Sequence, residues 1–112
     1  MRGRPKLFVK HTIPHCVVQV VRAHCADYQR KENALKDSNL SPEIRRNYET
    51  VNASILESLE EIEEMCRSDF LADIADNRGY EKSRINWLFS KTAYYNRKDK
   101  AIYDIAKKLN LV

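Results

Sequence analysis

Glycine and proline are scarce in this chain, with only 2 and 3 copies among 112 residues. Strands that are joined by tight turns need these residues at frequent intervals, so their scarcity argues against a β architecture. No apolar run approaches the ~20 residues that a membrane-spanning helix requires, and the longest run, residues 16–21, is interrupted by Gln19. We therefore expect a soluble, cytoplasmic, all-α protein that makes no contact with a membrane.

Cysteine is also scarce, and the 3 cysteines are scattered, which favours reduced thiols buried on helices over disulfides. Two His–Cys pairs, residues 15–16 and 24–25, raise the question of a zinc site. On one continuous helix, however, residues nine apart lie on opposite faces and cannot share an ion. The chain also lacks a glycine-rich phosphate loop, a nucleophile elbow and a His-Glu metal motif. We expect no metal, no other cofactor and no enzymatic activity.

Charge is distributed unevenly, although the formal net charge is only +4. Residues 43–76 hold ten acidic side chains against three arginines, whereas residues 82–108 hold eight basic side chains against two aspartates. Residues 2–10 add four more basic side chains. A polyanion such as DNA is attracted to the two basic ends and repelled by the acidic middle.

The pattern of apolar residues and helix caps predicts three regions: a flexible basic arm (1–13), an antiparallel helical hairpin (14–67) and a C-terminal helix-turn-helix (68–112). Pro14 begins a first helix that runs to about residue 37. Ser41 caps a second helix, residues 42–66, whose apolar stripe from Ile44 to Met65 is close to a heptad seam. Because this stripe is longer than the first helix can cover, we expect its surplus to bind a second copy of the chain.

The C-terminal region contains three further predicted helices: 69–77 with Ser68 as its cap, 81–89, and 91–109 with Ser90 as its cap. Gly79 is expected to supply a turn with positive φ. Two helix-turn-helix registers are compatible with this pattern, and both use the helix 81–89.

In the first register the helix 81–89 reads the DNA, through Lys82, Ser83, Arg84 and Asn86. In the second register it supports a recognition helix that begins at Ser90 and presents Lys91, Thr92, Tyr95, Asn96 and Lys98 to the groove. Trp87, Leu88, Phe89 and Tyr94 then hold the two helices together. The placement of the turn glycine favours the first register, and the clustered bases favour the second.

The C-terminal residues SKTAYYNRKDKAI, followed by IAKKL, resemble the end of the RinA/ArpU-type late transcriptional regulators of phages of Gram-positive bacteria. The resemblance covers residues 90–109. It implies a helix-turn-helix similar to region 4 of sigma factors, in the second register, and a role in transcription of late phage genes.

The chain also begins with Arg2-Gly3-Arg4-Pro5-Lys6, which resembles the core of an AT-hook. In that motif both arginines enter a narrow A·T minor groove, and the glycine allows close approach. A plain solubilising basic tail is the alternative interpretation of these residues.

Together these patterns predict a sequence-specific DNA-binding transcriptional regulator of phage or prophage origin. Its expected partner is double-stranded DNA, with RNA polymerase and a homodimer as further candidates. The alternative is an α-helical interaction or assembly protein, or a small terminase-like DNA-packaging subunit, that uses the helix 42–66 as its partner-binding seam. The candidate DNA-binding residues are Arg2, Arg4, Lys82, Arg84, Lys91, Thr92, Tyr95, Arg97, Lys98 and Lys100.

Overall fold

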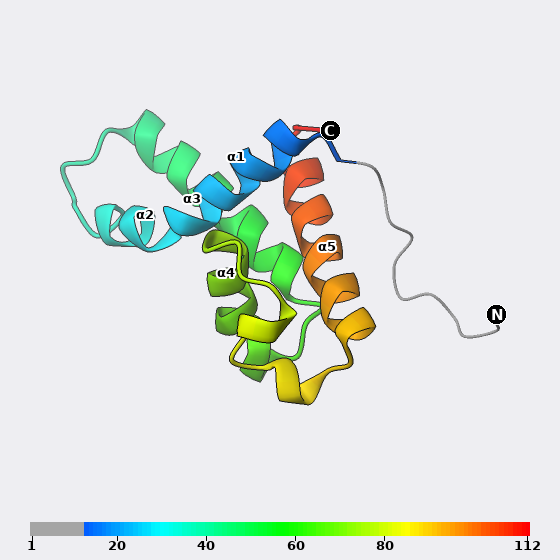
Figure 1. Cartoon of the computed structure of the whole chain (residues 1–112). Helices are drawn as coiled ribbons and strands as arrows, with labels where there is room; N and C mark the ends of the chain where they lie inside the picture. The colour runs from blue at the N-terminus through cyan, green and yellow to red at the C-terminus, as the bar shows by residue number, and fades with distance from the viewer. Residues whose placement is uncertain (1–12) are drawn as a thin grey trace.

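The computed structural model describes residues 13 to 112, and this part of the chain is helical, with no β-strand. The elements are α1 (His15–Ala26), α2 (Tyr28–Ala34), α3 (Pro42–Leu59), the 3-10 helix η1 (Glu64–Cys66), α4 (Arg67–Ala75), the 3-10 helices η2 (Tyr80–Lys82) and η3 (Asn86–Leu88), and α5 (Lys91–Lys108). Figure 1 shows α2 and the start of α3 projecting to one side of the other helices. The all-α class is confirmed. None of the described helices is long and apolar enough to cross a bilayer.

Two of the predicted helix caps are confirmed. The Ser41 hydroxyl accepts a hydrogen bond from the Ile44 N–H at 3.2 Å, and the Ser90 hydroxyl accepts one from the Ala93 N–H at 3.1 Å. Each bond satisfies one of the N–H groups that a helix leaves unpaired at its start, which fixes where α3 and α5 begin. The third predicted cap, Ser68, is wrong because it lies inside α4.

The first predicted helix is interrupted at Asp27, which separates α1 from α2. The Asp27 carboxylate accepts hydrogen bonds from the Arg30 guanidinium, one of them at 2.7 Å. Aspartate has a low intrinsic helix propensity, which favours an interruption at this position. The break lets α1 pack against α4 and α5 while α2 packs against α3.

The predicted N-terminal hairpin is therefore formed only by α2 and α3. Asn52 Nδ2 on α3 donates to the Tyr28 carbonyl at 3.1 Å and to the Glu32 carboxylate at 2.9 Å. Arg45 donates to the Leu35 carbonyl at 2.9 Å, which holds the loop between the two helices. Because α1 joins α4 and α5 instead, both ends of the described chain contribute to one hydrophobic core.

The second helix is also shorter than predicted, since α3 ends at Leu59 and not near Cys66. The guanidinium of Arg67, in the next α-helix, donates to the backbone carbonyls of Ile62 at 2.9 Å and Glu60 at 2.8 Å. These bonds satisfy carbonyl groups of the turn after α3, so the chain can leave the helix without burying an unpaired polar group.

The apolar stripe of α3 lies in the core of the monomer. Val51, Ile55 and Leu59 are at most 6% exposed and pack in the same cluster as residues of α1, α4 and α5. The interpretation of this stripe as a surplus seam for a second copy is therefore wrong at its centre. Only its ends, Ile44 and Met65, stay exposed.

The end of α4 is set by Asn77 and not by Gly79. Asn77 adopts φ 54°, and the N–H of Arg78 donates to the Asp73 carbonyl at 2.8 Å, which closes the helix as a Schellman motif. Gly79 has φ −89° and an extended backbone, so the expected positive φ is wrong. A Cβ at Gly79 would lie 3.1 Å from the Tyr95 hydroxyl, and close approach is therefore the reason for glycine here.

The helix predicted over residues 81–89 is wrong, since this segment contains only η2 and η3. Between them, Ser83 is extended, with φ −74° and ψ 140°. The Ser83 hydroxyl donates to Asp73 Oδ2 at 2.6 Å, and the Tyr80 hydroxyl donates to the Phe89 carbonyl at 2.9 Å. These tertiary bonds outweigh the weak helical preference of so short a segment. Neither helix-turn-helix register is formed as predicted, because both require this helix.

A small polar cluster between α1 and α2 makes stability depend on pH. Lys31 is only 4% exposed, and its Nζ lies 3.0 Å from His24 Nδ1. Burial, and then the Lys31 charge, lowers the pKa of His24. The unfolded chain therefore takes up a proton at higher pH than the native protein does. Stability is full above the ordinary histidine pKa of about 6.5 and falls as the pH drops below it.

The variant His24→Gln should remove this dependence. Between about pH 7.5 and about pH 5.5, the urea midpoint of the variant should fall less than that of the wild type. Circular dichroism at a series of pH values measures both midpoints. The same slope in the two proteins would contradict the prediction.

Candidate nucleic-acid interface

A buried carboxylate, Asp73 of α4, fixes the path of the chain between α4 and α5. Its Oδ2 accepts hydrogen bonds from the Ser83 hydroxyl at 2.6 Å and the Tyr94 hydroxyl at 2.8 Å, and its Oδ1 lies 3.4 Å from Arg78 Nη1. Burial, and then the bond to Asp73, raises the pKa of Tyr94 above its usual range. Asp73 is 1% exposed, and so buried a charge is tolerated only with such partners. The side chains of Arg78, Ser83 and Tyr94 are thereby held together around one carboxylate.

Two of the predicted DNA-binding residues, Tyr95 and Lys98, support the same turn from inside. Lys98 is 8% exposed, and its Nζ donates to the Arg78 carbonyl at 2.7 Å. Burial lowers the pKa of Lys98. The Tyr95 hydroxyl accepts a hydrogen bond from the Tyr80 N–H at 3.0 Å. The polar atoms of both side chains thus form hydrogen bonds within the protein.

Two more predicted residues, Arg97 and Lys100, are paired with acidic side chains that follow α3. Arg97 Nη2 lies 3.2 Å from Glu63 Oε2, and Lys100 Nζ contacts the Glu61 carboxylate. The hydrogen bond from Lys100 lowers the pKa of Glu61. A backbone hydrogen bond, followed by the bond from Arg97, lowers the pKa of Glu63. Part of the acidic middle of the chain therefore neutralises part of the basic C-terminal region.

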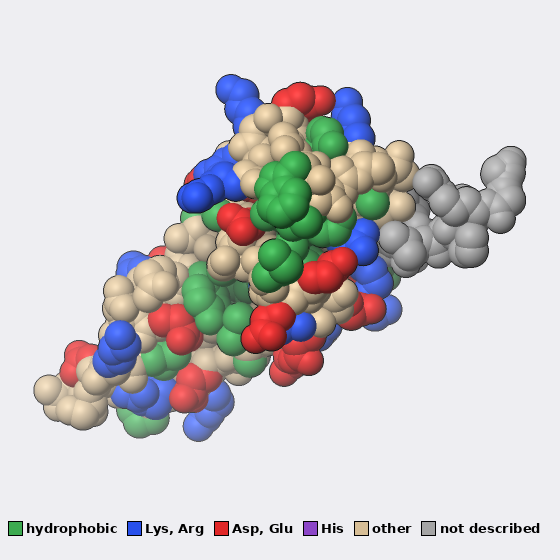
Figure 2. Space-filling model, turned by 90° about the horizontal axis from the view of Figure 1, so that it is seen from below, with side chains coloured by type: hydrophobic (Ala, Val, Ile, Leu, Met, Phe, Trp, Pro, Cys, Tyr) green, Lys and Arg blue, Asp and Glu red, His purple; other side chains and the backbone are tan. Residues whose placement is uncertain are grey.

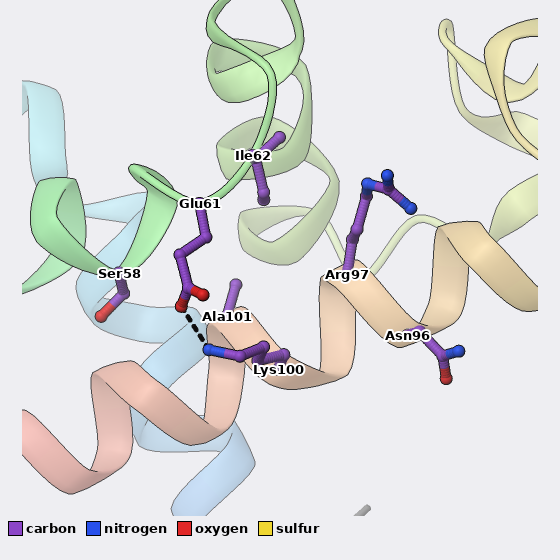
Figure 3. A pocket seen from close by; sticks show the side chains of 7 residues that line it. All are labelled: Ser58, Glu61, Ile62, Asn96, Arg97, Lys100 and Ala101. Carbon is purple, nitrogen blue, oxygen red and sulfur yellow. Dashed lines mark hydrogen bonds and ion pairs between the residues drawn. The ribbon is translucent and has the colours of Figure 1, made fainter. Parts of the chain in front are cut away.

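A shallow hollow of about 160 Å³ lies beside these pairs, between the end of α3 and α5 (Figure 3). Its lining consists of Ser58, Glu61, Ile62, Asn96, Arg97, Lys100 and Ala101. A space of this size holds a few water molecules. Glu61 is paired with Lys100 across it, and the Ser58 hydroxyl donates to the Ser54 carbonyl at 2.8 Å. These groups already have partners, so the hollow offers no activated nucleophile or base.

The other described residues of the predicted set, Lys82, Arg84, Lys91 and Thr92, are all exposed at one end of the molecule. Lys91 Nζ lies 3.6 Å from Glu81 Oε2, with both side chains more than 60% exposed, so this pair is weak. Lys82 and Arg84 form no ion pair with any residue from 13 to 112. These cations remain available to an external anion.

Trp87 lies on the same segment, between Arg84 and Lys91 in the sequence. It is 73% exposed, more than any other large hydrophobic side chain of the described residues, so its expected role between two helices is wrong. Its turn, η3, is anchored by Ile85, which is 6% exposed and accepts a hydrogen bond from the Leu88 N–H at 3.0 Å. Figure 2 views the molecule from this end and shows grouped hydrophobic side chains with acidic as well as basic side chains around them. We refer to five residues together as the Trp87 surface: Lys82, Arg84, Trp87, Lys91 and Thr92.

No family model, curated protein or solved structure matches this chain. What the protein does is therefore inferred from its own residues and their geometry. Arg2 and Arg4, the predicted minor-groove residues, lie outside the described part of the chain. Among the described residues, the structure brings four of the predicted side chains to the Trp87 surface and uses the other four internally.

Asp73 is the important residue that the sequence patterns did not single out. A signal was present, because Asp73 lies three residues after Phe70 and directly before Ile74, on the side of the helix that these apolar residues bury. An acidic residue on an apolar face indicates a buried polar partner.

Proposed function

We propose that the protein is a sequence-specific DNA-binding regulator that contacts double-stranded DNA with the Trp87 surface. The supporting observation is that Lys82, Arg84 and Lys91 remain available at one end of the molecule, beside the first turn of α5, whereas Arg97, Lys98 and Lys100 are engaged internally. Exposed lysines and arginines neutralise phosphates and release counterions. The free N–H groups and the positive dipole end of α5 add to this attraction.

In this proposal α4 and α5 act as the two helices of a helix-turn-helix with an enlarged connection, residues 76–90. The first residues of the second helix contact base edges in such motifs. Lys91 and Thr92 occupy that position in α5, and both are exposed. The resemblance of residues 90–109 to the RinA/ArpU-type regulators favours the same helix. A regulator of that type would act on late phage genes together with RNA polymerase.

The combined variant Lys82→Ala and Arg84→Ala tests the phosphate contacts. Each lost contact should reduce the slope of log affinity against log salt by about one, so the slope should fall by about two. Fluorescence anisotropy of a labelled duplex at several salt concentrations measures it. The control is Lys107→Ala with Lys108→Ala, which removes two exposed charges from the opposite end of α5 and should leave the slope unchanged.

If both variants changed the salt slope equally, the phosphate contacts would lie elsewhere on the protein. If the wild type bound no duplex at ~50 mM salt, the proposal would be contradicted altogether. Sequence specificity is tested by selecting bound duplexes from a random pool. Thr92→Ala should relax the selected sequence, at about 1–3 kcal/mol for a lost base contact. Arg84→Ala should weaken all sequences alike.

The alternative function, an α-helical interaction or assembly protein, has less support from the geometry. The centre of its proposed seam on α3 is buried, and only Ile44, Leu56 and Met65 remain exposed between residues 42 and 66 as large hydrophobic side chains. A small terminase-like packaging subunit shares the DNA-binding part of the proposal and would use the same Trp87 surface.

A further inference from the structure

The indole of Trp87 is exposed but is carried by a well-anchored turn. η3 follows the buried Ile85, and the next residue, Phe89, packs edge-on against Phe70 with ring centroids 5.7 Å apart. The Asn86 side chain also lies 3.5 Å from the Glu81 carbonyl, which ties η3 to η2. The backbone that carries this large exposed ring is therefore anchored, and little backbone entropy is lost when the ring binds a second flat group.

The charge of the segment that carries the ring points to a polyanion. Residues 80–92 carry three cations, Lys82, Arg84 and Lys91, and a single carboxylate, Glu81. Basic side chains beside an exposed aromatic ring are the combination with which proteins bind unpaired nucleic acid, since the cations follow the phosphates and a base stacks on the ring.

We propose, on the basis of the proposed function, that the Trp87 indole stacks on an unpaired base. The Trp87 surface then prefers DNA with locally opened base pairs over an intact duplex. In an intact duplex both faces of each base are covered by its neighbours, and the indole can reach a face only where a base has left the stack. Lys82 and Arg84, which have no ion-pair partner among residues 13–112, then hold the adjoining phosphates.

An acidic peptide fits this surface less well. Peptide helices and strands are recognised through several apolar anchors in a groove. Here the exposed apolar residues of the segment are Trp87 and its neighbour Leu88, which is 37% exposed. One flat ring suffices for a base but not for an anchored peptide.

Trp87 is the only tryptophan of the chain, so its fluorescence reports directly on stacking. Three labelled probes of the same length and sequence are titrated: an intact duplex, the duplex with a few mismatched central pairs, and the single strand. We expect the mismatched duplex to bind about 10- to 100-fold more tightly than the intact one and to quench the Trp87 emission. Trp87→Ala should lose this preference and bind both duplexes alike, whereas Trp87→Phe should keep most of it.

Equal binding of intact and mismatched duplex by the wild type, with unchanged emission, would overturn the stacking while DNA binding itself stands. Failure to bind any of the three probes would overturn the proposed function as well. A polyglutamate chain that quenches Trp87 as strongly as the mismatched duplex would overturn the inference in favour of an acidic polypeptide. The Lys107→Ala with Lys108→Ala variant serves as the control and should keep the wild-type preference.

Discussion

Replacing Asp73 with alanine should lower the free energy of unfolding by about 3–5 kcal/mol. The substitution leaves the hydroxyls of Ser83 and Tyr94 buried without an acceptor, and each such loss costs about 1–3 kcal/mol. It also removes one of the two acidic partners of Arg78 and leaves a cavity between α4 and the segment that follows it. Urea unfolding followed by far-ultraviolet circular dichroism measures the change.

Asp76→Ala is the matched control for this prediction. Asp76 pairs with the same Arg78 guanidinium, at 2.5 Å, but its side chain is 60% exposed, so its loss should cost less than about 1 kcal/mol. Tyr94→Phe removes only the hydroxyl, which donates to Asp73 Oδ2 at 2.8 Å and also lies 3.2 Å from the Arg78 carbonyl, and the loss should fall between the two, at about 1–2 kcal/mol. If Asp73→Ala cost no more than Asp76→Ala, the network would not hold the 76–90 segment in place.

Replacing Phe70 with alanine should cost a comparable amount, about 3–5 kcal/mol. Phe70 is fully buried and its ring lies 5.2 Å from the Tyr94 ring and 5.7 Å from the Phe89 ring, measured between centroids. The truncation therefore opens a large cavity where α4 meets both α5 and the residues before it. The urea midpoint should fall sharply, with no change in the dependence on denaturant if unfolding stays two-state.

Trp87→Ala removes an even larger ring from the same region and should change stability by less than about 0.5 kcal/mol, because that ring is 73% exposed. The Phe70 and Trp87 substitutions each remove an aromatic ring from this region, and the expected difference in stability follows from how deeply each ring is buried. The comparison also shows whether the Trp87→Ala protein is folded, on which the DNA experiments depend. A large loss of stability from Trp87→Ala would mean that the ring packs against the protein.

The sequence was most informative where structure is set locally. Ser41 and Ser90 each bond to the N–H three residues later, and residue type and spacing predicted both caps, although the same signal at Ser68 was wrong. The long amphipathic segments of α3 and α5 were predicted for the same reason. Local signals thus located the two longest helices of the described chain.

The sequence was least informative where distant residues compete with local preference. Segment 81–89 has the composition of a short helix, but Ser83 is bound to Asp73, ten residues earlier, and stays extended. The interaction partners of the basic side chains were equally impossible to predict from the sequence. Arg97 and Lys100 are paired with Glu63 and Glu61, more than thirty residues away, and no local pattern records such partners. The sequence presents these basic residues as one group. Only the fold separates those that are exposed from those that bind partners within the protein.

The packing of α1 against α4 and α5 has a consequence for synthesis on the ribosome. Val21 and Cys25 of α1 are buried in the finished protein by helices that follow far later in the chain. At about 5–20 residues per second, the interval between translation of Ala26 and of Lys91 lasts about 3 to 13 s. Throughout that time α1 lacks the covering that α5 supplies, and until Ala75 is translated it also lacks α4. A nascent chain of this protein should therefore be a substrate for ribosome-associated chaperones, and its core can close only after α5 has emerged.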